Sequence, residues 1–385
     1  MRLGFFIRLA FVLAFSTACS KDAPTPESVG EDPPARTGAK KRAKRSDRTD
    51  ASAEGSVSAK PPAKPPVYLP TVADDGAVQV VDLHVDTPWK VHFKDRPLAL
   101  PRGHATLKAL EKGHYIGITY PIYIPDYIHK WNPTIADAEA IYDTIDRLIG
   151  AHEQLVDASA GPIPEGRIAA FVSIEGAGPF AADISAIDRF IERGVRLIGP
   201  VHAHDNLLAT SATGKKYEYG LSDLGKAFCK RVYSKGALVD VSHMSDKAFA
   251  DLVPIATKAG APIVATHSNA RKLRGHKRNL TDQQLSAIAK SGGVAGVNLY
   301  RSFVAKGAPD MNDLVAQALH MIDIMGIDHM AIGSDFDGGT PVLESAASMP
   351  KFVKALRDAG LSDEDLRKLF AANALRVLAW QPSTK

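Results

Sequence analysis

Histidines and carboxylates recur in this sequence where short apolar runs end, and these are residue types that bind metal ions. His84 and Asp86 follow one such run, Glu175 ends another, and His243 and His267 each follow one. Alternate residues of a strand face the same side, so His84 and Asp86 can reach one ion together. Burying several imidazoles and carboxylates together would destabilise the fold unless a cation balanced their charge and lone pairs. Mixed nitrogen and oxygen ligands favour Zn²⁺ or a similar divalent ion.

This ligand set could hold one ion or two. The first His-x-Asp pair, with a further carboxylate, could hold one ion, and the two later histidines could hold a second. Glu175 could bridge the two ions through its two oxygens. A water molecule between two cations becomes hydroxide, which can attack a polarised carbonyl. Asp335, after the last apolar run, would then carry a proton from the nucleophile to the leaving amine. A purely structural carboxylate is the alternative role for Asp335.

The elements that must position this site are short apolar runs separated by segments of helical period. Eight strands are expected, at 78–83, 115–120, 168–174, 195–201, 237–242, 262–266, 293–298 and 329–334. The expected helices include 183–193, 222–234, 245–259, 281–290, 312–325, 350–358 and 362–379, with N-caps at Ser222, Ser245, Thr281 and Ser362. This alternation predicts an α/β fold with a parallel sheet, and eight units within residues 76–385 predict a closed (β/α)8 TIM-type barrel. The barrel fold places its active site at the C-terminal ends of the strands.

The first 75 residues differ from the rest of the chain. Residues 1–18 combine a charged start, a short apolar core and small residues, which is the pattern of a cleaved signal peptide. Cys19 stands where bacterial lipoproteins are acylated, so we expect an exported bacterial protein. It would be anchored to a membrane of the periplasm or cell envelope if Cys19 is lipidated, and secreted otherwise. Residues 20–75, rich in Ala, Pro and Lys, are expected to form a disordered linker.

Charge and cysteine content exclude two classes of protein. The 385-residue chain carries 47 Lys and Arg against 43 Asp and Glu, a formal charge of +4. Residues 1–66 hold 12 of the basic and 7 of the acidic residues, which leaves 35 against 36 for residues 67–385. A near-neutral body argues against nucleic acid as the main partner. Cys19 and Cys229 are the two cysteines in the sequence, which excludes a disulfide scaffold.

In their order along the chain, the site motifs resemble the membrane dipeptidase (renal dipeptidase) family of zinc peptidases, which are amidohydrolase-like barrels. The matching segments are 84–86, 174–176, 239–243, 266–270, 278–279 and 333–338, and the resemblance extends over residues 78–380. It implies two Zn²⁺ ions, one bound by His84 and Asp86 and the other by His243 and His267. Glu175 would bridge the two ions.

The resemblance also implies roles toward the substrate. His202 would contact the scissile carbonyl or its oxyanion, Arg278 would bind the terminal carboxylate, and Asp335 would handle the proton. A planar guanidinium can hold a carboxylate through two parallel hydrogen bonds. Without the resemblance, Arg278 would be interpreted as one more surface charge of the basic stretch 271–278. The family's usual Thr-His-Asn or Thr-His-Ser is absent here, so His204 competes with His202 for its role.

We therefore expect a zinc-dependent dipeptidase that hydrolyses the amide bond of dipeptides. The resemblance implies tolerance of a C-terminal D-residue and suggests a homodimer. One alternative is a metal-dependent amidohydrolase acting on a lactone, cyclic amide or phosphoester. Many such barrels bridge their metals with a carbamylated lysine on the fourth strand, which has no lysine here. A catalytically inactive lipoprotein that binds peptides or metal is the other alternative, disfavoured because every expected ligand is present.

Overall fold

The computed structural model describes residues 68–70 and 77–382. The expected signal peptide, Cys19 and most of the expected linker therefore lie outside the described residues. Within the linker range, the Tyr68 amide donates a hydrogen bond to the carbonyl of Ala158 at 2.8 Å. No helix in the described ranges is both long enough and apolar enough to span a bilayer.

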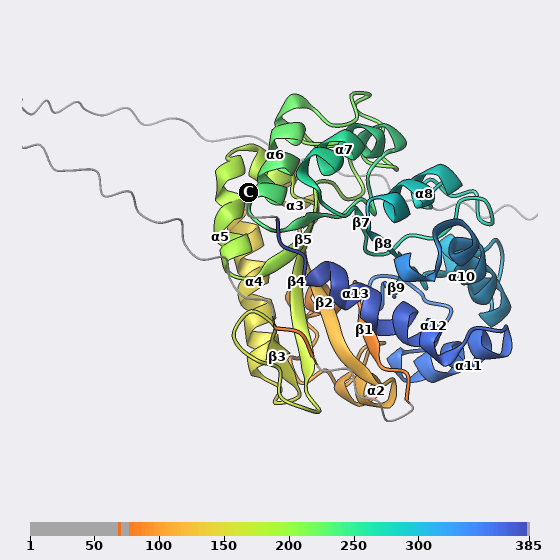
Figure 1. Ribbon diagram of the computed structural model, residues 1–385. Helices are drawn as coiled ribbons and strands as arrows, with labels where there is room; N and C mark the ends of the chain where they lie inside the picture. Colours follow the sequence, from red (N-terminus) through yellow and green to blue (C-terminus); the bar gives the residue numbers. More distant parts are fainter. Residues whose placement is uncertain (1–67, 71–76, 383–385) are drawn as a thin grey trace, which may run out of the picture. The chain divides into compact units, whose positions relative to one another are not determined.

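Eight parallel strands form a nearly closed barrel (Figure 1). They are β1 Val80–Asp82, β2 Tyr115–Tyr123, β4 Ile168–Glu175, β5 Val195–Gly199, β6 Leu238–Val239, β7 Val264–Ala265, β8 Val294–Val297 and β9 Met330–Ile332. Their hydrogen-bonded order is β6-β5-β4-β2-β1-β9-β8-β7. A single parallel bridge between Asp240 and Val264 joins the two outer strands, β6 and β7. This arrangement confirms the predicted (β/α)8 barrel.

Each predicted strand overlaps one strand of the barrel. All residues of β4 and β5 are buried, as expected where helices cover one face of a parallel sheet and the core fills the other. An additional strand, β3 (Leu155–Asp157), pairs only with β4, outside the barrel order, and was not predicted. Three residues are too few to show a strand period, so sequence patterning could not detect β3.

Helices surround the barrel (Figure 1). They are α1 Thr87–Phe93, α2 Leu107–Lys112, α3 Ile128–Trp131, α4 Ile135–Gly150, α5 Ile187–Glu192, α6 Asp223–Ser234, α7 Asp246–Ala259, α8 Asp282–Lys290, α9 Arg301–Val304, α10 Met311–Met325, α11 Met349–Asp358, α12 Asp363–Arg367 and α13 Asn373–Leu378. All four predicted N-caps are confirmed. In each, the side-chain oxygen accepts a hydrogen bond from the backbone N–H three residues further along the chain, and the caps are Ser222, Ser245, Thr281 and Ser362. The helix expected at 362–379 runs without a gap through α12 and α13, with a π-helical turn at Lys368–Ala372 between them.

Helix α13 packs against the N-terminal end of the barrel. Its Asn373 side chain donates to the carbonyls of Ile327 and Met330 at 2.7 and 2.9 Å, at the start of β9. The buried Arg196 of β5 donates to the carbonyls of Leu378 and Trp380 at 3.3 and 2.7 Å. These bonds attach the C-terminal segment to the end of the barrel opposite to the predicted active site.

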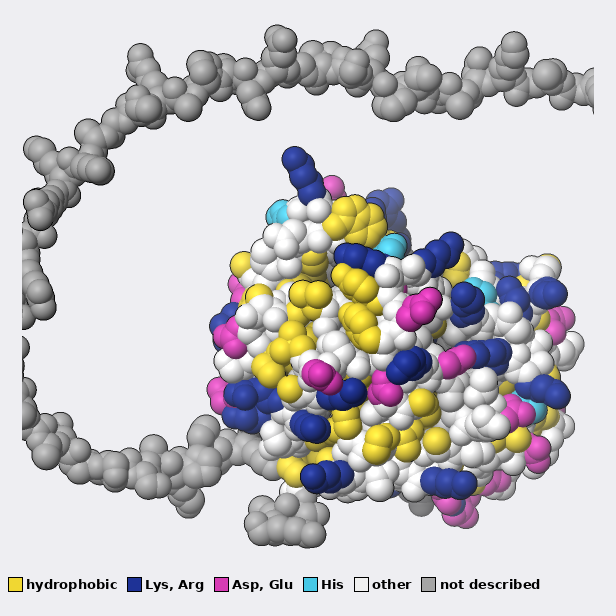
Figure 2. Space-filling view, turned by 90° about the horizontal axis from the view of Figure 1, so that it is seen from above, with side chains coloured by type: hydrophobic (Ala, Val, Ile, Leu, Met, Phe, Trp, Pro, Cys, Tyr) yellow, Lys and Arg dark blue, Asp and Glu magenta, His cyan; other side chains and the backbone are white. Residues whose placement is uncertain are grey.

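Cationic and anionic side chains are interspersed on the face of the molecule shown in Figure 2, with hydrophobic side chains among them. That distribution agrees with the near-neutral charge of the body. On this face, neither sign of charge forms the continuous stripe that nucleic-acid binding would need.

Candidate active site

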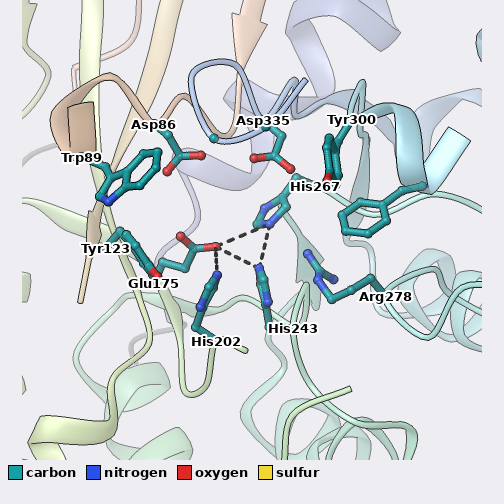
Figure 3. Close-up of a pocket in the computed structure, with 13 residues that line it drawn as sticks. Asp86, Trp89, Tyr123, Glu175, His202, His243, His267, Arg278, Tyr300 and Asp335 are labelled. Atoms are coloured by element: carbon teal, nitrogen blue, oxygen red, sulfur yellow. Dashed lines mark hydrogen bonds and ion pairs between the residues drawn. The ribbon is translucent and has the colours of Figure 1, made fainter. Parts of the chain in front are cut away.

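The predicted site residues meet at the C-terminal ends of the strands. Asp86 follows β1, Glu175 ends β4, and His243, His267 and Asp335 follow β6, β7 and β9. They border a cavity of about 250 Å³ (Figure 3). The cavity is lined by Asp86, Trp89, Tyr123, Glu175, His202, His243, His267, Arg278, Tyr300, Phe303, Asp335, Gly338 and Gly339. Residues spread over 250 positions of the chain therefore converge in space, as the sequence predicts.

The Glu175 carboxylate lies at the centre of the histidine cluster. Its Oε1 atom is 2.9 Å from His243 Nε2, 3.6 Å from His267 Nε2 and 3.7 Å from His84 Nε2. His202 Nε2 is 3.9 Å from the same oxygen. Figure 3 shows the imidazoles of His202, His243 and His267 pointing toward this carboxylate. Glu175 is thus placed where a bridging ligand between two cations would have to lie.

Three overlapping groups of side chains could each hold a metal ion. In every group the candidate ligand atoms lie within 4.8 Å of one another. The groups are His84–Glu175–His267, Glu175–His202–His243 and His84–Asp86–Asp335. All five predicted ligands belong to at least one group. His202 and Asp335, expected to act on the substrate, also come within ligand distance.

Buried polar atoms without partners show that the cluster fits a cation. Both ring nitrogens of His84 and Nδ1 of His243 are buried and make no hydrogen bond to any described residue. The Nε2 atoms of His243 and His267 lie 3.1 Å apart. Buried nitrogen atoms normally have partners, because leaving one unsatisfied destabilises a fold. A divalent ion bound by the imidazoles and Glu175 would supply the missing partner.

The protonation states of the cluster also favour a cation. Burial raises the pKa of Glu175 to about 8. Burial and the neighbouring Asp86 carboxylate raise the pKa of Asp335 to about 7. Burial keeps the pKa of His243 and of His267 well below the usual value, so both imidazoles are neutral at pH 7 and retain a lone pair. A bound cation would stabilise the ionised forms of the two carboxyl groups and so lower their pKa values again.

Asp335 is held in a constrained position. Its backbone has φ of 61°, in the left-handed region that non-glycine residues rarely adopt. Its Oδ2 atom accepts a hydrogen bond from the Asn298 side-chain amide at 3.0 Å. A Cβ atom at Gly338 would clash with both Asp335 Oδ1 and Asp86 Oδ2. The glycine at position 338 therefore leaves the space in which these two carboxylates approach each other.

Arg278 lies inside the cavity wall and is only 4% exposed. The single hydrogen bond that its side chain makes in the described structure is a long one, 3.5 Å from Nη1 to Ser268 Oγ, while Nε and Nη2 have no partner. Burial lowers its pKa to about 10, so the guanidinium remains charged at neutral pH. A buried, unpaired guanidinium is a ready partner for an anionic ligand. The alternative role as one more surface charge is therefore wrong.

His202, and not His204, faces the site. The His204 side chain is 55% exposed, and its Nδ1 atom lies 3.1 Å from Asp126 Oδ2. It borders a separate cavity together with Trp131. His202 lies between the two cavities, because Nε2 faces Glu175 while Nδ1 is 4.0 Å from the same Asp126 carboxylate.

Two buried aspartates that sequence reasoning did not assign position the ligands. Asp82 Oδ1 accepts the amides of His84 and Ser334 at 3.1 and 2.9 Å, joining the ends of β1 and β9. Asp240 accepts the amide and the hydroxyl of Thr266 at 3.0 and 2.6 Å, joining the ends of β6 and β7. A signal was available, because an aspartate within an apolar strand requires hydrogen-bond donors nearby.

Aromatic side chains close the cavity on two sides and were also not predicted. Trp89 and Tyr123 lie on one side, with ring centroids 6.3 Å apart. Tyr300 and Phe303 lie near Arg278, with centroids 4.8 Å apart. Figure 3 shows Tyr300 and Arg278 across the cavity from Trp89 and Tyr123. A cavity of this volume between apolar rings suits a small ligand with charged groups.

A TIM-type barrel whose C-terminal rim gathers imidazoles, carboxylates and an unpaired guanidinium defines the class of a metal-dependent hydrolase. Residues 76–382 match the model of the membrane dipeptidase family, peptidase family M19. The chain belongs to this family and is a metallo-dipeptidase, a hydrolase that acts on peptide bonds. The resemblance seen in the sequence motifs is thereby confirmed.

Individual proteins are similar to this chain in sequence or in fold. An uncharacterized Klebsiella pneumoniae protein, named from the region 5′ of pqqA, is 41% identical over 232 residues, 56% of this chain and 84% of that protein. An uncharacterized dipeptidase of Schizosaccharomyces pombe is 33% identical over 231 residues, 57% of this chain and 55% of its own length. A solved Rhodobacter sphaeroides metallo peptidase, liganded with a phosphinate mimic of L-Ala-D-Ala, has the same fold. It has a TM-score of 0.69 and 24% identity, and the match covers 78% of this chain and 98% of that one.

Proposed function

We propose that this protein hydrolyses the amide bond of dipeptides with two Zn²⁺ ions. His84 and Asp86 would bind one ion, His243 and His267 the other, and Glu175 would bridge them. The observation that carries this proposal is the single Glu175 oxygen faced by three imidazoles at 2.9 to 3.7 Å. When bound, the ions would supply an acidified water molecule as nucleophile and polarise the scissile carbonyl.

Asp335 is the residue best placed to move the proton. Its carboxylate is oriented by Asn298 and lies close enough to Asp86 for the two to interact directly. From this position it would accept a proton from the attacking water and deliver it to the departing amine. The other two carboxylates that line the cavity, Asp86 and Glu175, are assigned to the ions, which leaves Asp335 for the proton.

His202 would stabilise charge on the carbonyl oxygen. Burial and the nearby Arg278 lower the pKa of His202 to about 3, so the imidazole is neutral and keeps one N–H to donate. A fixed donor aimed at an oxygen that gains charge lowers the barrier to amide cleavage. His204 cannot take this part, because its ring is outside the cavity.

Arg278 would measure the length of the substrate. Its two unpartnered guanidinium nitrogens could bind the terminal carboxylate. Because the whole cavity measures about 250 Å³, a carboxylate bound there would leave space for only a short substrate beside the histidine cluster. The proposal includes tolerance of a C-terminal D-residue; the Rhodobacter protein of the same fold is liganded with a mimic of L-Ala-D-Ala.

The proposal extends to location and assembly. The sequence pattern of residues 1–18 supports export, and Cys19 would be acylated and anchor the protein to the membrane of the cell envelope. Labelling of cells with a clickable palmitate analogue should then mark the wild-type protein and spare a Cys19→Ala variant. A homodimer is proposed on the family resemblance, and light scattering of the purified body would measure its mass.

A hydrolysis screen tests the function directly. Zinc-loaded protein is offered L,L- and L,D-dipeptides, tripeptides, lactones and phosphoesters, with an Asp335→Asn variant as background. Cleavage of dipeptides, with tripeptides left intact, is the expected result. Cleavage of a lactone or phosphoester in preference to peptides would support the amidohydrolase alternative. Binding without turnover of any substrate would support the inactive binding protein instead.

A further inference from the structure

A second cavity adjoins the active site on the Arg278 side. Its volume is about 350 Å³, and Tyr300 lines both this cavity and the catalytic one. The Tyr300 side chain is thus part of the wall of both cavities. Figure 3 shows Tyr300 on the same side of the active site as Arg278. A group bound at Arg278 would therefore lie on the Tyr300 side of the active site.

The second cavity is lined by cations. Arg274, Arg301 and Lys306 contribute to its wall, and no aspartate or glutamate does. The Nε atom of Arg274 donates to the Ser302 carbonyl at 3.0 Å, and Nη2 of Arg301 donates to the Pro309 carbonyl at 3.1 Å. These bonds orient the two guanidinium groups without neutralising them. None of the three cations forms an ion pair within the described part of the chain.

Charged groups nearby are already engaged. Arg271, on the same loop as Arg274, forms two hydrogen bonds of 2.7 Å with Asp246. The acid nearest in sequence, Asp310, accepts the amides of Asn312 and Asp313 at 2.8 and 3.3 Å at the start of α10. The positive charge of the second cavity therefore remains available for a ligand.

We propose that these three cations form a subsite for an acidic side chain on the C-terminal residue of the substrate. The inference rests on the proposed function, in which Arg278 binds the terminal carboxylate. The side chain of that same residue leaves the chain one atom away from the carboxylate, beside Tyr300. The substrate class is therefore dipeptides that end in glutamate or aspartate.

The test compares Ala-Glu with Ala-Gln, which differ in charge and hardly in shape, in both L,L and L,D forms. For the zinc-loaded wild-type protein, kcat/KM should favour the acid by about fivefold in at least one form, as expected for partly exposed ion pairs. The preference should shrink in 0.5 M NaCl, because salt screens exposed charges. In Arg301→Gln and in Arg274→Gln the ratio should fall toward one, through a higher KM for Ala-Glu.

Lys272→Gln is the matched control. It removes an exposed cation of the same basic stretch that does not line the cavity, and it should keep the wild-type ratio. Hydrolysis of Ala-Ala in the same assay separates the two levels of the proposal. If Ala-Ala is cleaved but Ala-Glu and Ala-Gln are cleaved equally well in both forms, the subsite is overturned alone. If no dipeptide is cleaved, both the proposed function and the proposed subsite are contradicted.

Discussion

The Thr266 hydroxyl donates a hydrogen bond of 2.6 Å to Asp240 Oδ2. An ionised carboxylate only accepts, so this bond uses the one proton of the hydroxyl. Thr266 Oγ1 must then accept from His267 Nδ1, which is 2.8 Å away. The remaining nitrogen of His267, Nε2, keeps its lone pair and points toward Glu175 at 3.6 Å. Asp240 thus selects the tautomer of His267 that can bind a metal.

Replacing Thr266 with valine should weaken zinc binding by about 10- to 100-fold, the usual effect of losing a hydrogen bond behind a ligand. Competition with a chromophoric chelator would measure the affinity, and ¹⁵N shifts of histidine in the metal-free protein would report the tautomer. Thr266→Ser keeps the hydroxyl and should restore both. Thr119→Val is the control, because the buried Thr119 hydroxyl has no partner among the described residues. Equal affinity in all variants would contradict the role of Asp240.

Metal analysis of the purified protein should find close to two zinc equivalents, one for each half of the ligand set around Glu175. Dialysis against a chelator should abolish hydrolysis, and added zinc should restore it. Because metal bound only by the folded protein stabilises it, the melting temperature should rise on reloading. A protein with no bound divalent metal and no response to added metal would exclude this site.

Asp335→Asn should retain zinc but reduce kcat by about 10²- to 10⁴-fold, the range for loss of a general acid–base group. The amide keeps the shape of the side chain but cannot carry the proton. Zinc content and kcat measured on the same preparation separate proton transfer from metal binding. An unchanged kcat would refute the assigned role, and a loss of zinc would make Asp335 a ligand.

Amidation of the C-terminus of a good dipeptide substrate should raise KM by about tenfold or more, because a charge-assisted pair with Arg278 is lost. Arg278→Lys should weaken binding of the free acid as well, since an ammonium cannot form two parallel bonds. Initial rates over a range of substrate concentrations give both values. Equal KM for acid and amide would show that Arg278 does not bind the terminal carboxylate.

Asp337 should stabilise the fold more than a surface acid does. Its carboxylate accepts from Arg96 Nη1 at 2.6 Å and from the Thr87 hydroxyl at 2.7 Å. Asp337→Ala should reduce the free energy of unfolding by about 3–5 kcal/mol, as for a broken buried ion pair. Asp363→Ala, which removes an exposed partner of Arg357, should cost less than about 1 kcal/mol. Urea unfolding of both variants would measure the difference, and equal losses would contradict it.

The contribution of Asp337 should also depend on pH. Burial alone would raise its pKa, but the bonds from Arg96, His104 and Thr87 outweigh burial and lower it. A lowered pKa means that the stabilisation is complete above the unfolded-state value, about 3.9, and is lost as the pH falls through the folded-state value. The wild-type protein should therefore lose its advantage over Asp337→Ala under strongly acidic conditions. If the difference in free energy of unfolding between the two proteins stayed constant down to about pH 2, this prediction would be contradicted.

Much of the site could be predicted because parallel barrels place strand ends together. His84, Glu175 and His267 end or follow apolar runs, so their convergence follows from topology alone. The choice between His202 and His204 could not be made in this way. It depends on how the chain turns after Gly199, where β5 ends, and on the Asp126 carboxylate from a distant loop.

Other features depend on contacts that no local pattern contains. Arg278 lies in a basic, mostly exposed stretch, and only the packing of Phe303 and Ser268 shows that it is buried. The hydrogen bonds of Asp240 to Thr266 depend on the register between two strands that have only two residues each. Sequence reasoning can suggest that a buried aspartate needs donors, but not which donors it finds.

The single bridge between β6 and β7 makes this junction the place where the barrel wall would open first. His243 follows one of these strands and His267 the other, so a cation bound by both would crosslink the two sides. The bound metal would then limit local opening of the barrel between β6 and β7, in addition to its part in catalysis. The amide of Val241, which donates to Val264 at 2.8 Å, should exchange with deuterium faster in the metal-free protein than in the loaded one.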